Sequence, residues 1–199
     1  QLTDLDSENV NVNLSNSNIG DGGSVELSQA GDITVLGEGS MGISVQSLGG
    51  GGGMVNNFFK GSAGGQGSSG AVSISYAGTL EARNTGSVGI FAQSEATDTQ
   101  GGIEIELASE SVISAGPDGV GVQIVGGSNN QISNSGSIFA AQRNSPYRPP
   151  YGIAIQGGMA SETVVNESGA LVFGNVDLGG GINTFENSFG ATVLAGDFL

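Results

Sequence analysis

A short cassette of alternating apolar and polar residues recurs along this chain and restricts its fold more than any other feature. Each copy has an alternating segment, a corner of small polar residues, a second alternating segment, another corner and a third segment that opens on Gly followed by Ile or Val. In the first copy the three segments start at Ser24, Gly31 and Gly42. Further copies begin near Ala71, Ile103, Gln131, Thr163 and Thr184. Period-two alternation predicts β-strands, and its recurrence predicts a repeat architecture.

The spacing inside the cassette is more regular than the spacing between cassettes. If Glu110 occupies the corner in the third copy, 11 residues separate the second corner from the third strand in three copies: Gly31 to Gly42, Gly78 to Gly89 and Glu110 to Gly121. A constant wall with variable connections is typical of a solenoid rung. We therefore predict an all-β fold: a parallel β-helix of about five to six rungs, each of three short strands.

The same alternation predicts which side chains form the core. Val25, Leu27 and Ile33 should point inward, whereas the Glu, Ser, Thr and Gln residues between such positions should point outward. Small polar residues stand just before three glycine corners, at Asn134-Ser135, Asn166 to Ser168 and Asn187-Ser188, and they favour tight turns and stacked side-chain hydrogen bonds. One rung alone buries too little apolar surface to offset the entropy of ordering its backbone, so stability must come from the stack.

The predicted organisation is one domain over residues 1–199. Residues 1–23 form an N-terminal partial rung or cap, and residues 24–199 carry the repeats. Two insertions interrupt them. The first, at residues 48–70, is rich in Gly and Ser and carries Phe58, Phe59 and Lys60. The second, at residues 143–151, lengthens the interval from Gly136 to Gly152 to 16 residues.

The composition excludes several classes of function. The chain has no Cys and no His, so it has neither a thiolate metal site nor a Ser-His-Asp triad. Its net charge of −15 disfavours nucleic acid as a partner, and no stretch approaches the roughly 20 apolar residues of a membrane helix. Asp21 and Asp118 are isolated turn acids without a repeated calcium register. We expect no cofactor, no metal and no direct membrane insertion by this fragment.

Three strings resemble the passenger domains of Gram-negative autotransporters (type V secretion). They are Gly42-Ile43-Ser44-Val45-Gln46-Ser47-Leu48-Gly49-Gly50-Gly51, Val88-Gly89-Ile90-Phe91-Ala92-Gln93-Ser94 and Gly174-Asn175-Val176-Asp177-Leu178-Gly179-Gly180-Gly181-Ile182-Asn183-Thr184-Phe185. The resemblance covers roughly residues 24–196. It implies a β-solenoid outside the cell, at the outer membrane, linked to a C-terminal barrel that this sequence does not include. Members of the family range from adhesins and virulence factors to proteases, so the resemblance does not fix an activity.

The leading functional hypothesis is a secreted or cell-surface module that is not an enzyme. It would act as an adhesin or display scaffold through its lateral loops, with a host or bacterial surface protein, a glycan or a second copy as partner. The candidate binding residues combine aromatic and cationic character, which recognition surfaces favour. They are Arg143, Tyr147, Arg148 and Tyr151 in the second insertion, and Phe58, Phe59 and Lys60 in the first.

Two alternatives remain open at this point. A polysaccharide-active β-helix enzyme would use clustered outward acids, and Glu104 and Glu106 face outward together on one predicted strand. A purely structural stalk or filament would instead use the open ends of the coil, because unpaired terminal rungs expose strand edges.

Overall fold

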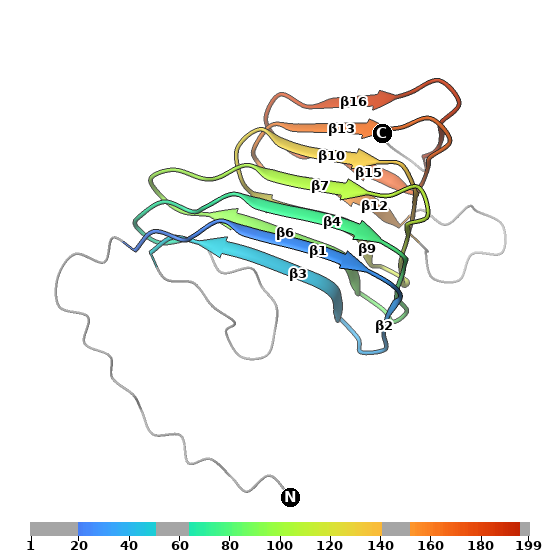
Figure 1. Ribbon diagram of the computed structural model, residues 1–199, viewed down its shortest axis with the longest axis horizontal. Coiled ribbons are helices and arrows are strands. Elements are labelled where there is room, and N and C mark those ends of the chain that lie inside the picture. The colour runs from blue at the N-terminus through green and yellow to red at the C-terminus, as the bar shows by residue number, and fades with distance from the viewer. Residues whose placement is uncertain (1–19, 51–63, 141–151, 196–199) are drawn as a thin grey trace, which may run out of the picture.

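The structure is a computed structural model, and it describes residues 20–50, 64–140 and 152–195. The described residues form strands only, arranged as a stack of coils in three parallel sheets (Figure 1). This confirms the predicted β-solenoid of about five to six rungs. Each rung contributes one strand to each sheet in turn, and the sixth contributes its first two strands within the described residues.

Sheet A is made of the first strand of every rung. Its strands, in spatial order, are β1 (Val25–Ala30), β4 (Val72–Ala77), β7 (Ile103–Leu107), β10 (Asn130–Asn134), β13 (Glu162–Asn166) and β16 (Thr184–Asn187).

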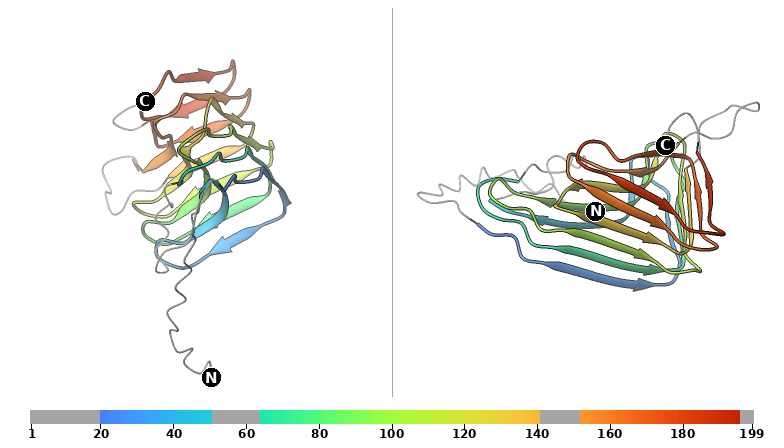
Figure 2. Two further views of the ribbon diagram at one scale, coloured as in Figure 1. Left: turned by 90° about the vertical axis from the view of Figure 1, so that its left-hand side faces the viewer. Right: turned by 90° about the horizontal axis from the view of Figure 1, so that it is seen from above.

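Sheet B is made of the second strand of every rung. Its strands are short, and the sheet closes one side of the coil (Figure 2). It contains β2 (Ile33–Val35), β5 (Thr79–Ala82), β8 (Val112–Ala115), β11 (Ser137–Ala140), β14 (Leu171–Phe173) and β17 (Thr192–Leu194).

Sheet C, made of the third strands, lies behind sheet A in Figure 1. It contains β3 (Met41–Leu48), β6 (Val88–Glu95), β9 (Val120–Gly126), β12 (Ile153–Gln156) and β15 (Asn175–Asp177).

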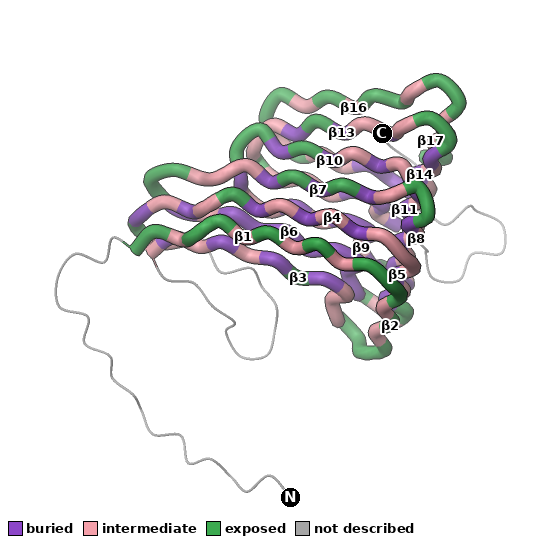
Figure 3. The backbone as a smooth tube through the Cα atoms, viewed as in Figure 1, coloured by how far each residue is buried: buried purple, intermediate pink, exposed green. Residues whose placement is uncertain are grey.

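The core runs along the axis of the stack, between the three sheets. Residues at equal positions of successive rungs pair in register, so like side chains stack on like: Leu27 pairs with Ile74, and Ile74 with Ile105. Strand β7 alternates fully buried and exposed residues, as the sequence predicts (Figure 3). Val25, Leu27 and Ile33 point to the core and are half-buried, because their rung lies at the end of the stack.

The stacked side-chain hydrogen bonds predicted for the small polar corners are present, and asparagines make them. Asn134 Nδ2 donates to Asn166 Oδ1 over 2.8 Å, and Asn166 Nδ2 donates to Asn187 Oδ1 over the same distance. Asn134 and Asn166 are fully buried at the corner between sheets A and B. These hydrogen bonds run along the stack, parallel to the backbone ladders, and tie three successive rungs together.

The third rung shows where the 11-residue spacing fails. Pairing of Val112 with Thr79 places Ser111, not Glu110, at the position of Gly78. The reason is the next corner: residues 116–119 connect β8 to β9, whereas the longer segment 83–87 connects β5 to β6. The assumed role of Glu110 restored the count of 11 but shifted the alignment by one residue.

The fourth rung differs from the expected alignment as well. Pairing of Ile153 with Val120 places Gly152 level with Gly119, and Ala154 takes the position of Gly121. The connection in this rung is therefore longer than the glycine spacing predicts. It still rejoins the wall in register, which is the behaviour expected of an insertion at a solenoid corner.

Candidate functional site

The outer face of sheet A is a broad surface of small polar and acidic side chains. Its side chains form two columns that run across the rungs, in the order Glu26, Ser73, Glu104, Gln131, Thr163, Thr184 and in the order Ser28, Ser75, Glu106, Ser133, Val165, Glu186. In both columns each acid is stacked on uncharged neighbours. This alternation avoids like charges directly opposite one another, which would destabilise the sheet.

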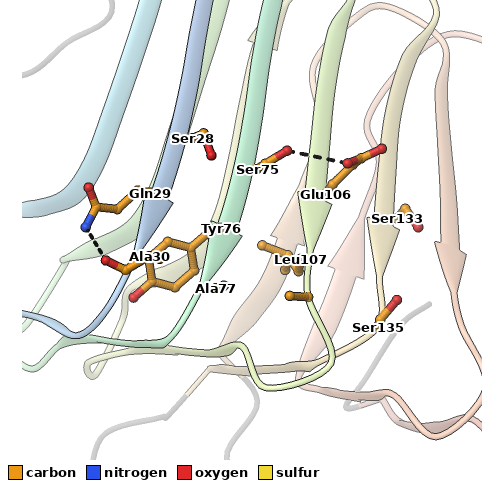
Figure 4. A pocket seen from close by; sticks show the side chains of 11 residues that line it. Ser28, Gln29, Ala30, Ser75, Tyr76, Ala77, Glu106, Leu107, Ser133 and Ser135 are labelled. Carbon is orange, nitrogen blue, oxygen red and sulfur yellow. Dashed lines mark hydrogen bonds between the residues drawn. The ribbon is translucent and has the colours of Figure 1, made fainter.

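A shallow hollow of about 330 Å³ lies on this face at the carboxyl ends of strands β1, β4 and β7 (Figure 4). Ser75, Glu106 and Ser133 line it, and the Ser75 hydroxyl donates to Glu106 Oε2 over 3.4 Å. Tyr76 also lines it but is 2% exposed, and its hydroxyl donates to the Gly31 carbonyl over 3.0 Å. Burial, with a smaller contribution from Asp32, raises the pKa of the Tyr76 phenol. Tyr76 is therefore a structural, neutral hydrogen-bond donor.

A second hollow, of about 250 Å³, lies at the amino end of the same face, beside Ser73, Glu104 and Gln131. The predicted outward orientation of Glu104 and Glu106 is confirmed, because both are exposed. The neighbours that line the two hollows supply hydroxyl and amide groups, which suit hydrogen bonding better than proton transfer. Within the described residues no three metal-ligating side chains gather at one point.

The candidate binding residues of both insertions lie outside the described residues. These are Arg143, Tyr147, Arg148, Tyr151, Phe58, Phe59 and Lys60. Their assignment as binding residues stays a prediction. The structure does place the chain on either side of each insertion.

Both insertions join the wall at the ends of sheet C. Residues 141–151 connect β11 to β12, at the corner that leads from sheet B into sheet C. Residues 51–63 follow β3, at the corner that leads from sheet C to sheet A. The flanking parts of the first insertion belong to the stack: Gly22 N donates to Ser68 O, and Gly65 N donates to Gly49 O, each over 2.7 Å.

The outer face of sheet C differs from that of sheet A because one of its strands, β6, is buried on both faces. Phe91 and Gln93 of β6 are 3% and 0% exposed, although neither belongs to the inward-facing core cluster. Gln46 Nε2 donates to Gln93 Oε1, and Gln93 Nε2 donates to Glu95 Oε2. Sheet C thus carries a hydrogen-bonded row of side chains on its outer side, across strands β3 and β6.

A buried carboxyl group, which the sequence did not single out, lies at the corner between sheets C and A. Glu162 is 1% exposed, and its Oε1 accepts hydrogen bonds from Asn130 Nδ2 and Gly158 N, over 3.2 and 3.3 Å. Its Oε2 has no hydrogen-bond partner among the described residues. Burial raises the pKa of Glu162, and the hydrogen bonds from Gly158 and Asn130 oppose that rise in part.

Replacing Glu162 with Gln is expected to raise the melting temperature at pH 7. The pKa of Glu162 in the folded protein lies above its ordinary value of 4.5, so the folded state binds more protons than the unfolded state between these two pKa values. Its contribution to stability therefore falls as the pH rises through this window. The advantage of E162Q should shrink as the pH falls to 4.5 and below. Thermal unfolding of both proteins across this range measures it, and an advantage that grows toward acid pH would contradict it.

Comparisons with known proteins identify no relative of this chain: no family model matches it, and neither a curated protein nor a solved structure is significantly similar. The described residues contain no helix long and apolar enough to span a membrane.

Proposed function

We propose that this chain is a segment of a passenger-type β-solenoid displayed at the surface of a Gram-negative bacterium, where it acts as a scaffold that is not an enzyme. The observation that carries the proposal is the continuity of the wall across its insertions. Strands β11 and β12 flank residues 141–151, and both pair in register with β8 and β9 of the preceding rung. A wall that keeps its register beside an insertion is suited to present that insertion laterally.

Composition and surface support the same function. The net charge of −15 keeps an elongated particle soluble and disfavours non-specific contact with anionic surfaces. Against this background, residues 143–151 concentrate Arg, Tyr and Pro in one short segment. Such a segment offers aromatic and cationic anchors at low entropic cost, which is the composition expected of an adhesive contact with a surface protein or glycan.

The fold supplies the design for a test of this function. Gly152 is level with Gly119, so residues 141–151 can be replaced by Gly-Pro-Asp, the sequence of residues 116–118 that makes the same corner one rung earlier. We expect the replacement to keep the thermal unfolding midpoint and to reduce attachment to host cells or to other bacteria about tenfold or more. Flow cytometry of bacteria that display either protein measures attachment.

A matched control removes an exposed apolar side chain at another corner of the wall. Met159, which is 85% exposed, serves this purpose as M159S. A second variant replaces Phe58, Phe59 and Lys60 with Ser. It tests whether the first insertion accounts for the attachment that remains after residues 141–151 are replaced. If neither loop variant attaches less than M159S, the display function proposed for the insertions is wrong.

A further inference from the structure

The outer face of sheet B carries an uncharged patch in the third, fourth and fifth rungs. Strands β8, β11 and β14 of these rungs lie together at one side of the stack (Figure 3). Their inward residues Ile113, Ile138 and Val172 are fully buried in the core, so the residues between them point outward. The outward residues form two columns: Ser114, Phe139 and Phe173 in one, and Val112, Ser137 and Leu171 in the other. All six are half-exposed, and we call them the sheet B patch.

Acids stand at outward positions of the other two walls. Sheet A carries Glu104 and Glu106 in the third rung, and the outer side of sheet C carries Glu95 and Asp177. In sheet B itself an acid returns one rung below the patch, where Glu81 pairs with Ser114. The sheet B patch is therefore a gap in the surface charge of a chain whose net charge is −15.

Contacts within the chain account for only part of the patch. The rings of Phe139 and Phe173 pack across adjacent strands, with their centroids 6.1 Å apart and their planes at 57°. Such a pair stabilises its own two rungs, yet both rings remain half-exposed. Val112 and Leu171 add apolar surface in the neighbouring column. Aromatic and aliphatic side chains without charges are the composition of the centre of a protein–protein interface.

The chemistry of the patch indicates what can cover it. A glycan needs several hydrogen-bonding groups, and the side chains of the patch offer only the hydroxyls of Ser114 and Ser137. An uncharged protein surface fits better. A second copy presents such a surface, its own sheet B patch, and this contact brings no acid onto an acid within the two patches. Sheet A packed on sheet A would instead bring Glu104 and Glu106 close to the acids of the other copy.

We propose that two copies of this chain pack side by side, each through its sheet B patch. Both copies use the same residues, so the contact is isologous and closes as a dimer. Apolar burial drives it, whereas Glu110 and Glu167, at the corners that precede β8 and β14, lie at its rim. The contact uses interior rungs on the side of the wall, so it is compatible with a stack that continues at either end. It gives the wall a role separate from that of the insertions.

Replacing Ser137 with Glu tests this contact. Ser137 lies between Val112 and Leu171, so in the dimer the added carboxylate of each copy would be buried against an uncharged surface. We expect S137E to weaken dimerisation about tenfold or more. Phe173→Ser, which removes a ring from the patch, should weaken it by a similar factor. Sedimentation velocity of the full chain over a concentration series measures the dissociation constant of each protein.

Each variant has a matched control on sheet A. T163E adds the same charge between the uncharged Gln131 and Thr184, and V165S removes an outward apolar side chain from the same rung as Phe173. Both controls should dimerise like the native chain. Circular dichroism checks that every variant is folded. S137E removes no apolar side chain, so it tests the contact even if F173S fails to fold.

Salt provides an independent measurement. Raising NaCl from about 50 to about 500 mM screens the repulsion between two copies of net charge −15, so it should strengthen dimerisation. Weakening by salt would contradict an apolar contact. A chain that stays monomeric at every concentration, or S137E and T163E variants that behave alike, would overturn the proposal. A monomeric chain whose S137E variant attaches less to cells would assign the patch to a different protein. Dimerisation is measured on the purified chain and attachment on displaying bacteria, so failure of this proposal is distinguishable from failure of the loop display.

Discussion

Gly121→Ala is expected to destabilise the protein by about 2–3 kcal/mol, a large effect for the addition of one methyl group. Gly121 lies on β9, and a Cβ at this position would be 2.5 Å from the Ala154 carbonyl oxygen and 2.7 Å from the Ile138 Cγ2 atom. The first is backbone of the adjacent strand and the second is a core side chain of sheet B that is fully buried. Neither can move without disturbing the stack, so the melting temperature should fall by about 5–10 °C.

The fourth rung explains why a Cβ is tolerated there and not at Gly121. Ala154 occupies the same register position, but the facing residue in the next rung of sheet B is Val172, which is shorter than Ile138. In addition, β12 pairs with β15 across a register shift, and no residue of β15 pairs with Ala154. Both obstacles that a Cβ meets at Gly121 are therefore reduced at Ala154.

The control for Gly121 is Gly23→Ala, because a Cβ at Gly23 meets nothing within 4 Å. The double variant G121A/I138V should recover part of the lost stability. Recovery should be incomplete, since the carbonyl oxygen of Ala154 remains. Thermal unfolding followed by circular dichroism measures all of these variants. If G121A is as stable as G23A, the close approach of sheets B and C at this position is wrong.

The parts of this fold that the sequence predicts are those that a period of two determines. Alternation identifies Leu27 and Ile33 as inward and Glu104 as outward, because each strand of a solenoid has one face toward the core. The small polar residues that precede the corners predict stacked side-chain hydrogen bonds, since a polar side chain repeated at one wall position has its own copies as neighbours. These are local signals, and the structure confirms them.

The register of individual rungs is harder to predict from the sequence, because it depends on corner lengths that vary from one repeat to the next. A corner one residue shorter in the third rung was enough to misplace Glu110. Glu162 gave no signal either, since an acid at a strand start resembles any exposed residue. Its burial arises because Asn130 occupies the same position one rung below and donates to it. Likewise, alternation predicts that Gln93 points outward but not that it is buried, because a period of two gives the direction of a side chain and not its neighbours.

Asn166→Ala should cost about 2–4 kcal/mol, the second large effect expected of a single substitution. The change removes the acceptor of Asn134 Nδ2 and the donor of Asn187 Oδ1, and it leaves Thr192 O without its side-chain donor. Asn134 is fully buried, so its lost hydrogen bond is not replaced by water. Thr163→Ala, at the outward position of the same strand, should have little effect on the urea midpoint of unfolding.

A second substitution separates the loss of hydrogen bonds from the loss of volume. Leu107 occupies the same wall position two rungs earlier, which means that the corner accommodates Leu. Asn166→Leu therefore fills the space but removes the amide, and we expect it to be nearly as destabilising as N166A. If N166L were as stable as the native protein, side-chain packing alone would account for this corner. A loss in both variants would identify the amide stack as the element that joins the last three rungs of the described residues.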